Sequence, residues 1–208
     1  MKPLPNPVDY YIYTGQEIPA PTLYAYLMAG NGVIKLAETA HFRAAAPVYP
    51  YWAAVAGLPD YPPGIELKVP KIPARWLYLV LDHARNCGRH IEQMYHFHWW
   101  PVSSGPGFAP LGRGEWRVSI PRQQASAGRV SYHGGGDPTI VLDLHSHHAM
   151  LSFFSSTDNG DEQGLRFYAV IGRIYDQPEL RLRVGVYGDW LELDPLDLFD
   201  GLGPFVEA

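Results

Sequence analysis

Two histidines stand two positions apart, just after a continuous run of β-branched and apolar residues. The run covers residues 139–142 (TIVL), and the histidines are His145 and His147. Such a run is typical of a strand that is buried on both faces. Residues two apart in an extended segment point to the same side. We therefore expect the chain to fold around this strand, with both imidazoles directed toward one point.

A serine and an aspartate follow the two histidines. Ser155 and Asp158 are three residues apart, and they share one helix face if a helix begins at Ser155 or Ser156. Imidazole nitrogens and carboxylate oxygens are ligands that zinc accepts. His145, His147 and Asp158 can thus hold Zn²⁺. The fourth coordination position would stay open, as in catalytic rather than structural zinc sites.

Each half of this pattern also has an ordinary explanation. An H-x-H pair is common by chance, and Ser-x-x-Asp is also the signature of a capping box, which needs no metal. A second pair, His96 and His98, has no carboxylate at similar spacing after it, and we interpret it as packing or as part of a substrate groove. Asp161 and Glu162 are expected to be solvated charges at a helix end, and the alternative for Asp161 is that it orients a metal ligand. The two halves together favour the metal site.

The remaining pattern predicts a mixed α and β (α+β) fold with a mainly antiparallel sheet. Apolar residues recur at helical spacing over 73–87, and Gly88 is a natural stop. Pro73 suits the first position of that helix. Alternating or apolar runs predict strands that include 91–100, 116–120, 165–174 and 180–187.

The first 68 residues differ in pattern from the rest. Gly30-Asn31-Gly32 separates two β-prone runs, 24–28 and 33–36, which predicts a hairpin. A turn-rich stretch follows at 60–64. We therefore predict a small β-rich N-terminal unit over 1–68 and a main domain over 69–208. A stretch rich in Gly, Pro and Ser at 102–114 predicts a mobile loop.

Composition disfavours several classes of function. The formal net charge is −5 and no run of Lys or Arg occurs, which disfavours nucleic-acid binding. The single cysteine, Cys87, rules out a disulfide framework and is expected to be a buried thiol. No stretch reaches the ~18 apolar residues of a membrane helix. These features favour a cytoplasmic protein that does not insert into a membrane.

His145-x-His147, seven residues, then Ser155-x-x-Asp158 resembles the signature of the JAB/JAMM (MPN-type, Mov34/PAD-1) metalloprotease family. The resemblance implies a cytidine-deaminase-like JAB/MPN domain with flanking helices, and zinc bound by the two histidines and the aspartate. One departure is His148, which stands where the family usually has proline. We expect the His148 side chain to point away from the metal.

The resemblance also implies a reaction. The family uses a glutamate on the strand after the first long helix, and Glu92 matches that position better than Glu38, Glu66 or Glu115. Glu92 would be the general base toward the attacking water, and Ser155 would help to stabilise the oxyanion. The substrate would be a peptide or isopeptide bond that follows the C-terminus of a ubiquitin-like protein.

A narrower resemblance concerns possible partners. Residues 142–172 are similar to the A-protein group of the bacterial PRTRC cassette, which implies a ThiF-related (E1-like) partner. Two other functions stay open. One is a non-catalytic MPN-like binding module in a ubiquitin-like or plasmid-maintenance system, and the other is a zinc hydrolase that cleaves a small amide. The complete ligand set favours a zinc metallopeptidase.

Overall fold

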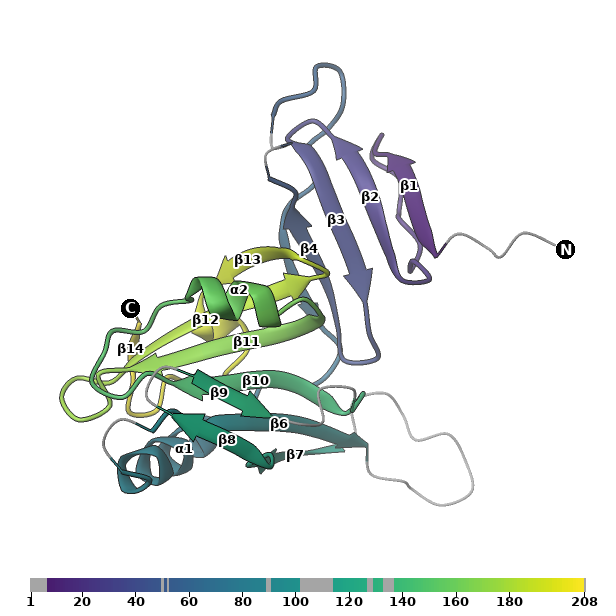
Figure 1. Ribbon diagram of the computed structural model, residues 1–208. Helices are drawn as coiled ribbons and strands as arrows, with labels where there is room; N and C mark the ends of the chain where they lie inside the picture. The colour runs from purple at the N-terminus through teal and green to yellow at the C-terminus, as the bar shows by residue number, and fades with distance from the viewer. Residues whose placement is uncertain are drawn as a thin grey trace, which may run out of the picture.

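Two β-sheets make up most of the protein in the computed structural model (Figure 1). The structure describes residues 7–49, 51, 53–88, 91–101, 114–126, 129–132 and 137–207. Strands are far more abundant than helices in these residues, and the two kinds are mixed along the chain. The prediction of a mixed α and β fold is confirmed at this level. The loop predicted over 102–114 lies almost wholly outside the described residues.

The N-terminal sheet has five strands in sequence order. They are β1 (Val8–Ile12), β2 (Tyr24–Ala29), β3 (Gly32–Glu38), β4 (Phe42–Pro47) and β5 (Gly64–Leu67). β1 runs parallel to β2, and the other neighbours are antiparallel. The predicted hairpin is confirmed, because β2 and β3 pair around Gly30 and Asn31. A Cβ at residue 30 would lie 2.3 Å from the Leu58 carbonyl oxygen, so only glycine fits there.

The second sheet has the order β13-β12-β11-β10-β6-β7, with β14 beside β12. Its strands are β6 (Met94–Pro101), β7 (Gly114–Ser119), β10 (Ile140–Ser146), β11 (Leu165–Gly172), β12 (Glu179–Val186), β13 (Asp189–Leu193) and β14 (Val206–Glu207). β8 (Gln123–Ser126) and β9 (Arg129–Tyr132) form a separate hairpin. β10 and β11 are parallel, as are β12 and β14, and the other pairs are antiparallel. The sheet is therefore mainly antiparallel, as predicted.

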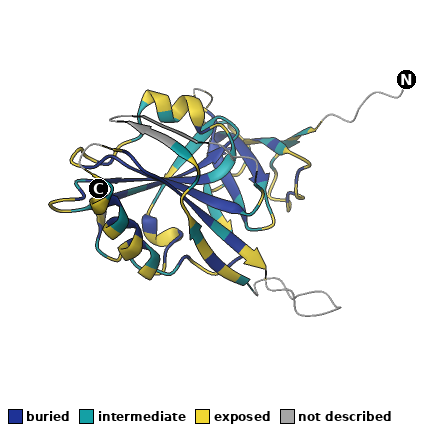
Figure 2. Ribbon diagram, turned by 60° about the horizontal axis from the view of Figure 1, so that its bottom comes forward, coloured by how far each residue is buried: buried dark blue, intermediate teal, exposed yellow. Residues whose placement is uncertain are grey.

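Helices cover the second sheet on opposite faces, as Figures 1 and 2 show together. α1 (Arg75–Asn86) packs on one face, α2 (Ser156–Asp161) lies over the other, and η1 (Pro195–Asp197) is a short 3₁₀ helix. The predicted start of the first helix was wrong by two residues. Pro73 precedes the N-cap Ala74, and the Ala74 N–H is held by Asp200 Oδ1 at 2.6 Å instead of by a helical bond.

The core forms where α1 and both sheets meet. Every residue of β10 is buried (Figure 2), and Leu77, Val80 and Leu81 of α1 belong to the same apolar cluster as Leu144. Such a strand, paired on both sides, gives the site a rigid base.

The N-terminal sheet contributes to this core as well. Phe42 of β4 lies 4.4 Å from Phe167 of β11, measured between ring centroids. The buried Lys35 forms an ion pair with Asp189 and donates to the Tyr187 carbonyl at 2.9 Å. The division into 1–68 and 69–208 stays a prediction.

No helix among the described residues has the length and apolar character to cross a membrane.

Candidate metal centre

His145 and His147 lie at the end of β10. His145 pairs with Met94 of β6 on one side and with Val170 of β11 on the other. His147 follows the strand, and its N–H donates to the Ile171 carbonyl at 2.8 Å. Both imidazoles are buried. Because hydrogen bonds hold the backbone from both sides, the two side chains are directed before any ligand binds.

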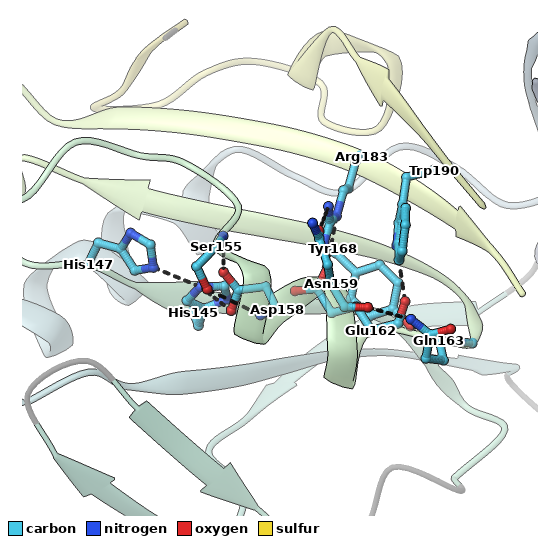
Figure 3. Close-up of polar contacts among 11 residues, drawn as sticks. His145, His147, Ser155, Asp158, Asn159, Glu162, Gln163, Tyr168, Arg183 and Trp190 are labelled. Atoms are coloured by element: carbon cyan, nitrogen blue, oxygen red, sulfur yellow. Dashed lines mark hydrogen bonds and ion pairs between the residues drawn. The ribbon is translucent and has the colours of Figure 1, made fainter. Parts of the chain in front are cut away.

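Three potential ligand atoms converge at this point (Figure 3). The Nε2 atoms of His145 and His147 are 3.1 Å apart, and Asp158 Oδ1 lies 3.5 Å from His145 Nε2. Within the part of the chain that the structure describes, these three residues form the one group of His, Cys, Asp or Glu whose ligand atoms all lie within 4.8 Å. The three residues singled out in the sequence are thus brought together.

The chemical state of the imidazoles suits a metal. Burial lowers the pKa of His145 and of His147, and the neighbouring Asp158 carboxylate opposes this shift only in part. Both rings are therefore neutral at pH 7, which is the form that binds metals. His147 Nδ1 lies 3.3 Å from the Leu151 carbonyl oxygen. An N–H donated there leaves Nε2 with its lone pair free. Two neutral imidazoles and a carboxylate fit Zn²⁺.

Ser155 and Asp158 form a complete capping box at the start of α2. The Ser155 N–H donates to Asp158 Oδ2 at 2.6 Å, and the Asp158 N–H donates to Ser155 Oγ at 3.2 Å. The ordinary explanation of this spacing is therefore correct, and it is compatible with metal binding. One carboxylate oxygen is used in the cap and the other, Oδ1, faces His145. The Ser155 O–H is left available as a donor.

Glu92 lies beside these residues but not in a strand. The predicted strand over 91–100 begins three residues later, at Met94. Two side chains replace the expected ladder bonds: Ser146 Oγ accepts from the Gln93 N–H at 3.0 Å, and Gln123 Oε1 accepts from the Met94 N–H at 2.8 Å. The Ser146 N–H still donates to the Gln93 carbonyl at 3.0 Å. The two chain segments therefore stay side by side as far as Gln93, the residue after Glu92.

The Glu92 carboxyl is buried, with 6% of the residue exposed. Burial, and to a lesser degree the Asp158 carboxylate, raises the pKa of Glu92 to about 7. A carboxyl group in this range can both accept and return a proton near neutral pH. Glu92, Ser155 and the three ligand residues all line one cavity of about 190 Å³.

Sequence reasoning missed part of the cavity wall. Asp143, Tyr168 and Glu162 also line it. Asp143 could have been found, because it precedes His145 by two residues on the same strand face. Glu162 was expected to be solvated, and that was wrong: it is 8% exposed and paired with Arg183, whereas Asp161 is exposed as expected. No local pattern reveals this pair, since its partners lie on different elements.

His148, His96 and His98 do not line the cavity. His148 is buried, and its backbone has φ +50°. Proline cannot adopt this conformation, so the backbone of this chain differs here from that of family members with proline at this position. His96 Nε2 is 3.5 Å from Asp143 Oδ1. His98 bonds Thr139 Oγ1 at 3.0 Å through Nδ1. Their contacts agree with the packing interpretation of this second pair.

Cys87 is half-buried rather than buried. Its Sγ lies 3.3 Å from His83 Nδ1, and His83 Nδ1 in turn lies 2.9 Å from the Tyr95 hydroxyl. The end of α1 therefore holds the thiol within a small polar group, away from the residues that line the metal-site cavity.

Comparison with known proteins agrees with the site. No curated protein matches this chain. A family model described as prokaryotic homologs of the JAB domain matches residues 79–184, just over half of the chain. The matched segment includes Glu92 and all four residues of the histidine–serine–aspartate pattern. The chain therefore belongs to the family of prokaryotic JAB domain homologs.

Proposed function

We propose that this protein is a zinc-dependent peptidase or isopeptidase. The JAB family includes zinc isopeptidases and also inactive MPN-like members, so membership alone does not decide between them. The observation that carries the proposal is that three ligand atoms lie within 4.8 Å of one another in a cavity shared with the buried Glu92. Burying a carboxyl group is unfavourable for folding unless a partner offsets it, and none of the ion pairs among the described residues includes Glu92. A catalytic role explains why it is there better than a binding role does.

His145, His147 and Asp158 would hold the ion. A bound Zn²⁺ supplies Lewis-acid chemistry, since it polarises a carbonyl group and acidifies water. Glu92 would take the proton of the attacking water and pass it to the leaving amine. The Ser155 O–H would donate to the oxyanion as it forms.

The proposed substrate is the amide bond after the C-terminus of a ubiquitin-like protein, as the family resemblance implies. Met150 and Phe153 line the cavity and are exposed to 47% and 43%. They offer an apolar contact to an incoming peptide. A ThiF-related partner stays a prediction that follows from the PRTRC resemblance alone.

Metal analysis of the purified protein tests the proposal. We expect about one zinc per chain, retained in His98→Ala and lost in His145→Ala. His98 is the matched control because it lies outside the cavity on the neighbouring strand. Absence of zinc from wild-type protein prepared without chelators would contradict the proposal.

Hydrolysis is tested with Glu92→Gln. This variant should keep zinc and lose about 10²–10⁴-fold of the rate on a C-terminal amide of a ubiquitin-like protein. Glu115→Gln, at an exposed strand position, should behave as wild type. A wild-type protein that binds zinc but cleaves no amide would favour the binding module, and an active Glu92→Gln would refute the assigned base.

A further inference from the structure

The helix that carries Asp158, α2, has little intrinsic stability and no buried apolar face to anchor it. α2 is six residues long, contains Gly160 and buries none of its residues. A helix of this length is not stable by itself, and glycine weakens it further. Its position on the sheet must therefore come from polar contacts with other elements.

One buried side chain supplies most of these contacts. Arg183 of β12 is 5% exposed. Its Nε and Nη2 both donate to Glu162 Oε2, at 2.9 and 2.5 Å, and its Nη1 donates to Asn159 Oδ1 at 2.7 Å. Figure 3 shows Arg183 reaching from its strand to these two residues. The planar guanidinium is thus bound to the last turn and the C-cap of α2.

The same guanidinium also contacts the chain just before α2. Its Cζ lies 3.9 Å from the centre of the Phe154 ring, and Phe154 immediately precedes the N-cap Ser155. Trp190 of β13 closes the group: its ring centre is 5.0 Å from the Arg183 Cζ, and its Nε1 donates to the Glu162 carbonyl at 3.0 Å. Arg183 therefore holds both ends of the helix.

We propose that Arg183 is a positioning residue for the metal centre. It fixes α2 at Phe154 and at Glu162, and by doing so it sets Asp158 Oδ1 opposite His145 and the Ser155 hydroxyl beside the cavity. The inference rests on the proposed function, because it gives Asp158 the role of a metal ligand. It adds a residue on a strand two places away from β10 that does not itself line the metal-site cavity.

A buried ion pair that only stabilises the fold is the competing explanation. That role would affect unfolding but leave the zinc affinity of folded protein unchanged. A positioning role requires the fork-shaped guanidinium, because an ammonium group cannot bond Glu162 and Asn159 and cover Phe154 together. Arg183→Lys keeps the charge and removes the fork, so it separates the two explanations.

The experiment measures zinc affinity by competition with a chromophoric chelator, well below the unfolding temperature. We expect about 10–100-fold weaker binding for Arg183→Lys, the usual effect of losing a residue that orients a ligand. Asn159→Ala, at an exposed position, should weaken binding less. Arg181→Lys is the matched control: it is two residues earlier on the same strand face and its partner Glu192 is 3.7 Å away. It should bind as wild type.

Amide hydrogen exchange of metal-free protein gives a second, metal-independent result. Exchange over 156–162 should be faster in Arg183→Lys than in wild type, with β11 and β12 unchanged. Wild-type affinity in Arg183→Lys would overturn this inference while leaving the proposed function intact. A wild-type protein that binds no zinc would overturn the proposed function, and this inference with it.

Discussion

The two segments that carry the candidate ligands are held in opposite ways. β10, which ends beside His147, has every residue buried and is paired on both sides. α2, which carries Asp158, buries none of its residues and is held by a capping box and by Arg183. The position of the histidines therefore depends on the packing that folds the domain. The position of the aspartate depends on a few polar contacts.

The largest expected effect is on the strand side of this comparison. Leu144 is fully buried, next to His145, in the main core. Leu144→Ala should lower the free energy of unfolding by about 2–5 kcal/mol, measured by urea denaturation. The folded fraction should bind zinc within a few-fold of wild type, because ladder bonds still hold His145. Leu79→Ala, at a residue 59% exposed on α1, is the control. A large loss of zinc affinity with unchanged stability would contradict the comparison.

The contrast also explains which parts the sequence could predict. The composition of the run at 139–142 predicts a buried strand, and the spacing of Ser155 and Asp158 predicts the start of a helix. Both signals are local. The contact between Arg183 and Glu162 joins β12 to α2, and nothing near either residue indicates it. The three-residue error at the start of β6 has the same cause, since Ser146 and Gln123 side chains replace backbone partners there.

On the helix side, Ser155→Ala should affect catalysis far more than folding. The loss of one cap changes the free energy of unfolding by about 1 kcal/mol or less when α2 is only locally affected. Loss of an oxyanion donor lowers the rate by about 10²–10³-fold. Ser156→Ala is the control, at the next residue, which is exposed. Equal rate losses in the two variants would show that Ser155 acts through the helix and not through its hydroxyl.

The pH dependence of the free energy of unfolding, measured on metal-free protein, tests whether the buried Glu92 carboxylate destabilises the fold. Its pKa is about 7 in the folded protein against 4.5 for an ordinary glutamate. Between these values the folded state holds the extra proton, so stability falls as the pH rises. The difference between the two pKa values limits the stability lost on ionisation of Glu92 to about 3 kcal/mol.

With EDTA present, Glu92→Gln should therefore be more stable than wild type at pH 8, by about 1–3 kcal/mol. At pH 4 both carboxyl and amide are neutral, and the two proteins should unfold at similar urea concentrations. A variant with no gain at pH 8 would show that the Glu92 carboxylate is well solvated.

The smallest expected effect concerns Gly160 of α2, and it tests how firmly this helix is held. Gly160 lies within α2, does not have a positive φ, and a Cβ there meets nothing within 4 Å. Gly160→Ala should therefore stabilise the helical state of α2 by up to about 1 kcal/mol. If the helix limits how well Asp158 is placed, zinc affinity should rise by up to about five-fold, since 1.4 kcal/mol corresponds to ten-fold. Hydrogen exchange over 156–162 should slow in parallel. Slower exchange with unchanged zinc affinity would mean that Arg183 and the capping box already hold α2 fully, and that helix propensity adds nothing to the site.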